Sequence, residues 1–471
     1  MSEYQYNKVT PEMIEKFKEI APKRVLVGDE INEDFTHDEM AIYGKARPEV
    51  LVEATSTEEV AAVVKLCNEN KVPVTPSGAR TGLVGGAVSI GGGVMISLTK
   101  MNKILGYDKE NFVVKIQSGV LLNDLAQDAE KQGLLYPPDP GEKFATVGGN
   151  VATNAGGMRA VKYGCTRDYV RAMTVVLPTG EIVKLGATVS KTSSGYSLLN
   201  LMIGSEGTLG IITELTLKVI PAPKSVISLI IPYENLEDCI ATVPQFFMHH
   251  LAPQALEFME KEVVMDTEKF LGKQVYPKEL EGTEIGAYLL ATFDGNSEEQ
   301  LEDIIEQASE VVLEAGAIDV LVADTPALKK DAWAVRGALL EAIEADTVLL
   351  DECDVVVPTN KIAYTKSLEA EADFRVKSFG HAGDGNLHIY TCSNDMEEGE
   401  FKKQVAVFMD KVYAKATEFG GMISGEHGIG HGKMDYLAES LGPVQMRIME
   451  GVKEVFDPNM ILNPGKICYK L

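Results

Sequence analysis

The sequence predicts an α+β protein, because two patterns alternate along it. Short runs rich in β-branched residues indicate strands, and stretches with an apolar residue every three or four positions indicate helices. The 471 residues, 45% of them hydrophobic and 24% charged, are enough for two or three domains with separate cores. No internal repeat and no low-complexity tract interrupts this pattern.

The alternation begins near residue 50. Ser56 and Glu59 form a capping box that starts a helix, and the strand "VPVT" follows it. A second helix ends at Gly133, which suits a left-handed cap, and the strands "GGVMISL" and "FVVKIQSG" lie between the two helices. The apolar faces of the helices consist of Val60, Val63, Val64 and Cys67 in the first and Leu122, Leu125, Ala126 and Ala129 in the second.

A domain boundary is predicted at "PAPKS", residues 221–225. Beyond it, the strands "SVISLII", "IGAYLLATF" and "IDVLVA" and one long amphipathic helix predict a second α+β unit. The apolar face of that helix carries Leu301, Ile304, Ile305, Ala308, Val311 and Val312. Glycines return from Gly420 in "GGMISGEHGIGHGK". We therefore expect domains at 1–220 and 221–420 and a C-terminal segment at 421–471.

Charge and cysteine content exclude several classes of protein. A net charge of -26 argues against binding to nucleic acid or to an anionic membrane, because both need a basic surface. The first twenty residues lack the apolar core of a secretion signal, and no apolar run is long enough for a transmembrane segment, so we expect a cytoplasmic protein. The six cysteines form no CxxC pair, which indicates buried small side chains rather than disulfides, iron-sulfur clusters or a zinc ribbon.

Glycine-rich loops in the first domain suggest a phosphate-containing ligand. "PSGARTGLVGGAV" at 76–88 suits backbone that approaches a phosphate closely, although it is neither a Walker loop nor a GxGxxG fingerprint. Taken alone, such a loop is more often a glycine-rich turn between strands. Two further glycine clusters, at 137–164 and 203–214, favour a long dinucleotide-like ligand that lies against several backbone turns.

These loops, followed by "FGHAGDGNLH", "SGEHGIG" and "NPGK" in that order, resemble the FAD-linked D-2-hydroxyacid dehydrogenases. This family includes D-lactate dehydrogenases and the flavin-bearing D subunit of glycolate oxidase, within the vanillyl-alcohol oxidase flavoprotein superfamily. The resemblance extends from about residue 50 to the end of the chain. It implies a two-subdomain FAD-binding domain of the vanillyl-alcohol oxidase type, an α+β cap domain with the substrate site, and a C-terminal segment that returns to the flavin.

The resemblance also implies which residues hold FAD. The pyrophosphate would lie against Ser77, Gly78, Thr81, Gly82 and Gly86. The rest of the cofactor would be lined by Pro138, Asp139, Thr146, Gly148, Gly149, Asn150, Thr153, Asn154, Gly156, Gly157, Glu206, Gly207, Ile212 and Asn463. Some members of the superfamily anchor the flavin covalently through a histidine or cysteine in a loop. None occurs between 76 and 88, so we expect non-covalent FAD.

Two of the seven histidines, His381 and His388, flank the turn "AGDGN". On the two arms of a hairpin they would face the same way, as two metal ligands must, although a purely structural pair is the alternative. Glu426 adds a carboxylate, and two histidines with one glutamate leave positions open, as catalytic divalent sites do. The family carries a metal on residues that match these three. In this chain the metal would be Zn, Fe(II) or Mn.

By the same resemblance, His427 is the expected general base. The alternative is that His427 is a histidine with a structural role only, and His431 is a weaker candidate for the base. Arg336 in "WAVR" is the expected clamp for the substrate carboxylate, the alternative being an exposed helix charge paired with Glu341 or another acid. A metal and a neutral histidine would together help to remove the hydroxyl proton while a hydride leaves for the flavin.

The predicted reaction is oxidation of a small D-2-hydroxy acid, D-lactate or glycolate, to the 2-oxo acid. Some relatives carry a lysine where this chain has Glu352, which disfavours a substrate with a second carboxylate. Without a nicotinamide fingerprint, a haem motif or iron-sulfur cysteines, the electrons would pass to an electron-transferring flavoprotein, an iron-sulfur subunit, a quinone or oxygen. A metal-dependent hydrolase and a non-catalytic flavin subunit are the competing hypotheses.

Overall fold

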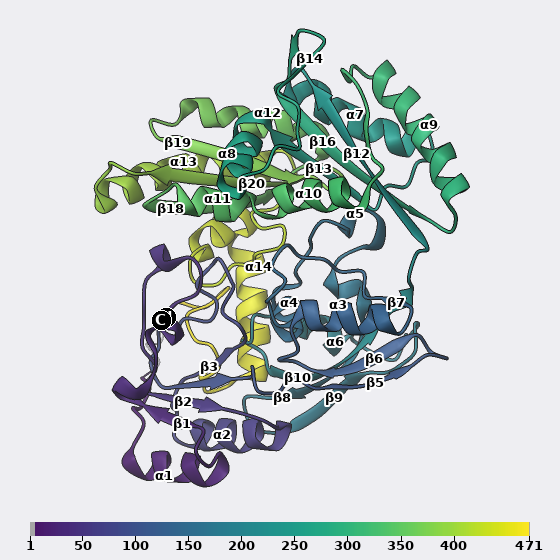
Figure 1. Ribbon diagram of the computed structural model, residues 1–471. Coiled ribbons are helices and arrows are strands. Elements are labelled where there is room, and N and C mark those ends of the chain that lie inside the picture. The colour runs from purple at the N-terminus through teal and green to yellow at the C-terminus, as the bar shows by residue number, and fades with distance from the viewer. Residues whose placement is uncertain (1–4, 471) are drawn as a thin grey trace. The chain divides into compact units, whose positions relative to one another are not determined.

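The computed structural model describes residues 5–470. Its contacts divide the chain into two compact units (Figure 1). Unit 1 contains the chain up to Ala155, Cys165–Ala222 and the residues from Glu426 onward, and unit 2 contains Gly156–Gly164 and Pro223–Gly425. Both units combine helices and sheets, which confirms the predicted α+β class.

Unit 1 is built on two larger sheets and one short strand pair. Its strands are β1 (Val25–Val27), β2 (Val50–Glu53), β3 (Val74–Ser77), β4 (Val94–Ser97), β5 (Ile104–Asp108), β6 (Val113–Gln117), β7 (Leu134–Leu135), β8 (Val170–Val176), β9 (Ile182–Gly186), β10 (Ile211–Lys218) and β11 (Ile220–Pro221). Its helices are α1 (Pro11–Ile20), α2 (Thr57–Glu69), α3 (Leu122–Lys131), α4 (Val147–Thr153), α6 (Leu198–Met202) and α14 (Met434–Phe456).

The first sheet has the strand order β1-β2-β4-β3, with β2, β4 and β3 parallel, and the second has the antiparallel order β5-β6-β10-β8-β9. The apolar face of α2 is fully buried against the first sheet, as its sequence period predicts. Ser56 caps this helix at the N–H of Glu59, but the Glu59 carboxylate binds Arg24 and the N–H of Thr55 instead of closing the box. Helix α3 forms as predicted, although Ala126 is exposed.

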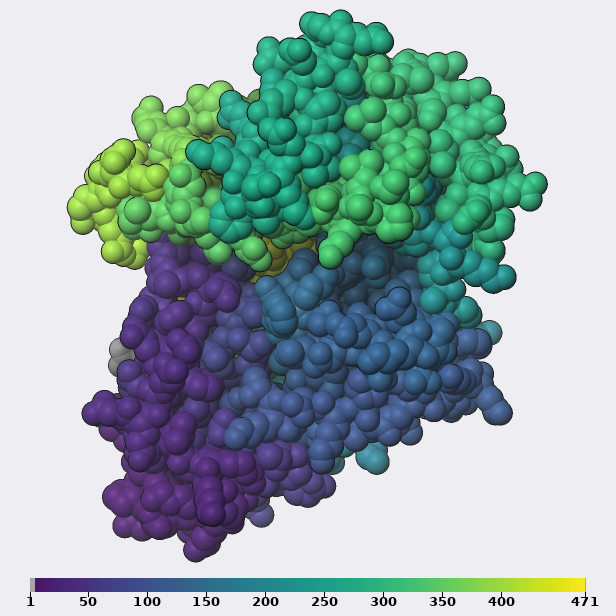
Figure 2. Space-filling view, in the orientation of Figure 1, coloured from purple at the N-terminus to yellow at the C-terminus, as the bar shows by residue number. Residues whose placement is uncertain are grey.

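The C-terminal segment completes unit 1. Asn463 donates its N–H to Val74 O at 2.7 Å, and Val74 donates to Ile461 O at 2.8 Å, so the segment lies alongside β3. Ile461 and Leu462 are fully buried in the core that α1, α2 and the first sheet share. On the face shown in Figure 2, the N-terminal residues of unit 1 (purple) and the blue residues that follow form one continuous surface.

Unit 2 is built on one large antiparallel sheet with the order β17-β12-β16-β13-β19-β20-β18, and β14 and β15 form a separate antiparallel pair. Its strands are β12 (Ser225–Tyr233), β13 (Ala255–Glu260), β14 (Glu279–Leu280), β15 (Thr283–Glu284), β16 (Ala287–Gly295), β17 (Leu321–Ala323), β18 (Leu349–Val356), β19 (Arg375–His381) and β20 (Asn386–Ser393). Its helices are α5 (Ala160–Tyr163), α7 (Leu236–Met248), α8 (Lys261–Leu271), α9 (Glu298–Glu314), α10 (Pro326–Gly337), α11 (Leu339–Ala345), α12 (Ile362–Ser367) and α13 (Glu398–Glu418).

Helices cover both faces of this sheet. Phe293 of β16 contacts Phe246 of α7, whereas Leu290, three residues earlier, packs in the core that α8, α10 and α11 form on the opposite face. Side chains alternate between the two faces along a strand, so the position of Leu290 tells which residues of the neighbouring strands point toward α10. The two units thus have separate cores.

The remaining predictions from the sequence concern membrane-spanning segments and cysteines. Among residues 5–470, no helix is long and apolar enough to cross a membrane. The predicted cytoplasmic location stays a prediction. Cys67, Cys239, Cys353 and Cys392 are buried thiols, as expected, and Cys165 and Cys468 are partly buried thiols.

Candidate active site

The hairpin of β19 and β20 brings the two predicted histidines onto one face of the sheet. Phe379 pairs with His388 across the strands, and His381 lies two residues beyond Phe379, so all three side chains point the same way. The ring centroids of the two histidines are 5.3 Å apart, and both side chains are almost fully buried. Gly385 makes the turn with φ 85°, and a Cβ there would lie 2.0 Å from Val357 O. The predicted hairpin is confirmed.

Glu257, which sequence analysis did not single out, lies beside His381. It is the register partner of His381 on β13, so both project from the same face. Each carboxylate oxygen is 2.9 Å from His381 Nδ1. Burial alone would raise the pKa of Glu257, but the charges of His381 and Arg336 outweigh it and hold the pKa below its usual value.

Arg336, on α10, binds the same carboxylate. Its Nε and Nη2 lie 2.8 Å and 2.5 Å from Glu257 Oε2, and its guanidinium lies 4.8 Å from the centre of the Phe379 ring. The pair is buried, with side-chain exposures of 7% and 0%. Arg336 is therefore not the exposed helix charge of the alternative, although it does pair with an acid other than Glu341. Its role as a substrate clamp stays a prediction.

Asp354 lies beside the other histidine of the hairpin, His388. It pairs with His388 in the sheet register, and its Oδ1 lies 3.7 Å from His388 Nδ1. Asn386 Nδ2 donates to Oδ1 at 2.7 Å, and Ser424 Oγ and the Gly425 N–H donate to Oδ2 at 3.0 Å and 2.9 Å. Asp354 thereby anchors the chain immediately before Glu426 and His427.

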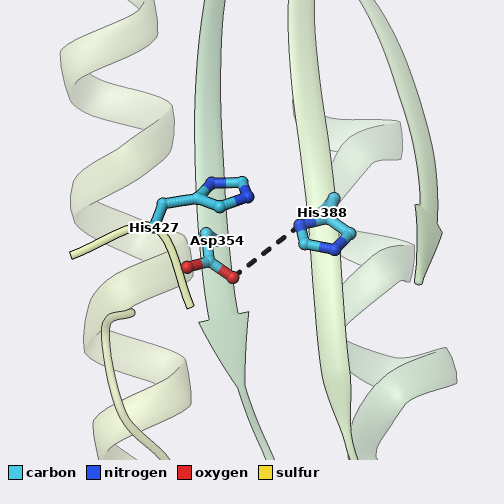
Figure 3. Close-up of side chains that lie close together, drawn as sticks. All are labelled: Asp354, His388 and His427. Carbon is cyan, nitrogen blue, oxygen red and sulfur yellow. Dashed lines mark ion pairs between the residues drawn. The ribbon is translucent and has the colours of Figure 1, made fainter. Parts of the chain in front are cut away.

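Two overlapping groups of side chains could hold a cation. Atoms of His381, His388 and Glu426 lie within 4.8 Å of one another, and so do atoms of Asp354, His388 and His427. Figure 3 draws the second group. In the second group, hydrogen-bond donors bind both carboxylate oxygens of Asp354. The two imidazoles and one carboxylate of the first group are the donors that divalent metals prefer, so these residues fit such a metal, and its presence stays a prediction.

His427 lies at the edge of this cluster. Its Nε2 is 4.0 Å from Glu426 Oε1, and its side chain keeps 14% of its surface exposed. His431, the rival base, lies in unit 1, where its ring faces Gly85 closely enough that a Cβ on that glycine would collide with it. Burial and then Lys466 lower the pKa of His431 to about 4. The neighbourhood of His431 is thus the glycine loop at 76–88.

At several positions the glycine loops of unit 1 pack too tightly to admit a side chain. A Cβ on Gly78 would lie 2.3 Å from Thr146 Oγ1, and one on Gly148 would lie 2.7 Å from Ser118 O. A Cβ on Gly207 would lie 2.5 Å from the ring of Pro76. Thr146 also caps α4, since its hydroxyl accepts the N–H of Gly149 at 3.3 Å. The segments predicted to bind FAD are therefore held against one another.

Buried polar atoms beside these loops fit a cofactor. Within residues 5–470, Ser118 Oγ, Tyr136 OH and Asn150 Nδ2 have no hydrogen-bond partner, although the three side chains are at most 8% exposed. Unpaired buried polar atoms are costly, and a ligand with many hydrogen-bonding groups removes that cost. FAD is such a ligand, so the residues present fit it.

The remaining predicted FAD residues differ in their surroundings. Glu206 accepts the N–H groups of Ile429 and Gly430 at 2.8 Å and 2.7 Å, and burial raises its pKa. Asn463 donates to Gly86 O at 3.0 Å and to Glu206 O at 2.8 Å. Both side chains therefore form hydrogen bonds between different loops of unit 1. Their contact with FAD stays a prediction.

The other predicted positions fall in four places. Ser77 ends β3, and Thr81, Gly82 and Gly86 lie in the loop after it. Pro138 and Asp139 precede α4, where Asp139 pairs with Lys143, while Thr153 and the left-handed Asn154 end α4, and Ile212 is buried in β10. Gly156 and Gly157 lie in the short stretch assigned to unit 2. Each assignment to FAD stays a prediction.

Comparison with known proteins shows the family to which the chain belongs. Residues 48–186 match the family model "FAD binding domain", and residues 222–467 match "FAD linked oxidases, C-terminal domain". The chain is 99% identical to a D-lactate dehydrogenase of Anaerostipes hadrus, with full coverage of both chains. It is 40% identical to a D-lactate dehydrogenase of Archaeoglobus fulgidus (90% and 92% covered) and 36% identical to glycolate oxidase subunit GlcD of Bacillus subtilis (90% of each covered).

Solved structures show the same fold at low identity. A substrate-bound p-cresol methylhydroxylase superposes with a TM-score of 0.77 at 19% identity, covering 98% of each chain. These matches define a two-domain, FAD-linked oxidoreductase. More narrowly, the chain belongs to the FAD-linked D-2-hydroxyacid dehydrogenases of the vanillyl-alcohol oxidase superfamily, which confirms the resemblance seen in its motifs.

Proposed function

We propose that this enzyme oxidises D-lactate to pyruvate, with glycolate as the second candidate substrate. The near-identical relative named D-lactate dehydrogenase is the observation that carries the proposal. The cluster of His381, His388 and Glu426 supports a metal-assisted reaction. When bound, FAD supplies the acceptor for the hydride that leaves the substrate carbon, and a divalent cation supplies electrophilic stabilisation of the substrate oxygens.

His427 is the proposed general base. The hydroxyl group of a 2-hydroxy acid is far too weak an acid to lose its proton unaided, whereas a neutral imidazole can accept that proton as the hydride leaves. The ring follows directly on Glu426 and lies near His388, so it can reach a hydroxyl group held beside the metal ligands. The alternative, a histidine with a structural role only, would not explain why His427 lies beside the proposed metal ligands.

Arg336 is the proposed clamp for the substrate carboxylate. Glu257 binds its Nε and Nη2, which leaves the Nη1 edge of the guanidinium for a second carboxylate. Glu352 argues for a substrate with a single carboxylate. It is buried on β18, two residues before Asp354 and on the same face, and it offers no cation for a second carboxylate where some relatives carry a lysine.

The electron acceptor is proposed to be another protein, either an electron-transferring flavoprotein or an iron-sulfur subunit. One similar protein is named as a subunit of glycolate oxidase, which supports a role in an assembly. A quinone is the alternative acceptor. The sequence offers no second redox centre within the chain, so reduced flavin must be reoxidised from outside it.

The test is anaerobic reduction of the purified flavoprotein by single substrates. We expect D-lactate to bleach the flavin fastest, glycolate more slowly and L-lactate not at all. D-2-hydroxyglutarate should also react poorly, because of Glu352. A preparation without a flavin spectrum would favour the metal-dependent hydrolase, and a flavin that no 2-hydroxy acid reduces would favour a non-catalytic flavin subunit.

A further inference from the structure

We propose that Glu257 is a positioning residue that directs the Nε2 atom of His381 toward the metal ligands and holds Arg336 in place. The proposal rests on the function proposed above, since it concerns the same metal cluster and the same clamp. Glu257 itself is neither an expected metal ligand nor an expected catalytic residue. It comes from β13, more than one hundred residues before His381 in the chain.

The chemistry of the carboxylate fixes which nitrogen of His381 carries a proton. Arg336 approaches Glu257 Oε2 through two nitrogens, at 2.8 Å and 2.5 Å, and a carboxylate paired with a guanidinium in this way is ionised. An ionised carboxylate can only accept hydrogen bonds. Both of its oxygens lie 2.9 Å from His381 Nδ1, so Nδ1 must donate, and in the neutral ring Nε2 is then the bare nitrogen.

The fold makes this arrangement rigid. Glu257 and His381 are direct register partners on adjacent antiparallel strands, so the sheet itself sets their separation. The Glu257 side chain is fully buried, and water cannot compete for its oxygens. Carboxylates that orient metal-binding histidines in this way raise metal affinity, and their loss commonly costs about 10–100-fold.

The same carboxylate also aligns the clamp. Arg336 is held by Glu257 on one edge and lies over the Phe379 ring on its face, which leaves the guanidinium one orientation. A single buried side chain therefore couples the metal ligand to the group that would hold the substrate carboxylate. The competing interpretation is that Glu257 only neutralises Arg336 and leaves His381 unaffected.

The first measurement needs no substitution. Full-length, FAD-loaded protein that has been stripped of metal by a chelator is labelled with ¹⁵N-histidine, and the ring tautomers are recorded at alkaline pH, with His381 assigned by comparison with His381→Gln. We expect a proton on Nδ1 and none on Nε2. A His381 ring protonated on Nε2 would overturn the proposal.

The second measurement uses Glu257→Gln. The amide oxygen of the new side chain would be drawn to Arg336, which turns its N–H groups toward His381 and removes the preference for the Nδ1 tautomer. We expect Zn²⁺, measured by competition with a chromophoric chelator, to bind about 10–100-fold more weakly. Wild-type affinity together with an unchanged tautomer would leave Glu257 as a neutraliser of Arg336 only.

Glu268→Gln is the matched control. Glu268 is also a buried glutamate of unit 2, but its carboxylate accepts the N–H groups of Val275 and Tyr276. The control should lower stability while leaving both the tautomer and the Zn²⁺ affinity unchanged. A similar loss of Zn²⁺ affinity in both variants would show that general loosening of unit 2 is responsible, and the proposal would be wrong.

Failure of the proposed role of Glu257 and failure of the proposed function would give different results. If wild-type protein binds no Zn²⁺, Mn²⁺ or Fe(II), the metal-assisted reaction fails, but the His381 tautomer still decides whether Glu257 orients the ring. If Glu257→Gln does not fold, the wild-type tautomer decides alone.

Discussion

Replacing Lys453 by methionine should destabilise unit 1 and release its flavin at a lower temperature. Lys453 lies near the end of α14, and its ammonium donates to Thr208 O at 2.7 Å, Leu462 O at 2.7 Å and Asp457 Oδ2 at 2.6 Å. Its side chain is 3% exposed and that of Asp457 is 0% exposed. The ammonium thus joins the glycine loop at 203–214 to the C-terminal segment.

The size of the loss in stability follows from the buried charge that the substitution leaves without a partner. Methionine fills most of the space of the lysine stem but leaves Asp457 as a buried carboxylate without a cation, and breaking a buried pair in this way costs about 3–5 kcal/mol. A domain of this size loses roughly 2–4 °C of melting temperature per kcal/mol. Lys453→Met should therefore lower the temperature of flavin release by roughly 6–20 °C.

The assay is the rise in flavin fluorescence on heating, because free FAD emits more strongly than bound FAD. Lys18→Met is the control, since Lys18 forms an exposed pair with Glu15 on α1 of the same unit, and such pairs contribute little. Adding Asp457→Asn to Lys453→Met should restore part of the stability by removing the stranded charge. A shift no larger than that of the control would refute the reasoning.

Four further predictions concern the cofactor and the chemistry. Heat or acid should release intact FAD into solution, and flavin that remains on the precipitated chain would contradict non-covalent binding. Gly78→Ala should lower flavin occupancy, because its Cβ would collide with the hydroxyl beside it, whereas Gly141→Ala, which meets nothing within 4 Å, should not. His381→Ala or His388→Ala should lose metal and turnover but keep FAD, because the flavin loops belong to unit 1, and elemental analysis with unchanged metal in both variants would refute the site. His427→Asn should keep FAD and metal but slow flavin reduction by D-lactate ~10²–10⁴-fold and lose the rise of rate with pH, since only the neutral ring accepts a proton; a wild-type rate and pH profile in stopped-flow experiments would exclude it as the base.

The sequence alone determined the local elements and the order of the motifs. Helix α2 forms where an apolar period follows the Ser56 cap, and the turn between β19 and β20 forms where glycines permit it. The same local logic identified three glycine loops and the hairpin histidines. These features depend on residues that are neighbours in the chain, so a pattern in the sequence reveals them.

Only the tertiary structure decided which distant groups serve those histidines. Glu257 reaches His381 because β13 and β19 are adjacent in the sheet, and no local pattern around Glu257 announces this. Arg336, which could have been an exposed charge by its sequence, is buried against the same carboxylate. The physical reason is that hydrogen bonds and charges act through space over a few ångströms, while strand order, which sets those distances, is decided by packing across the whole sheet.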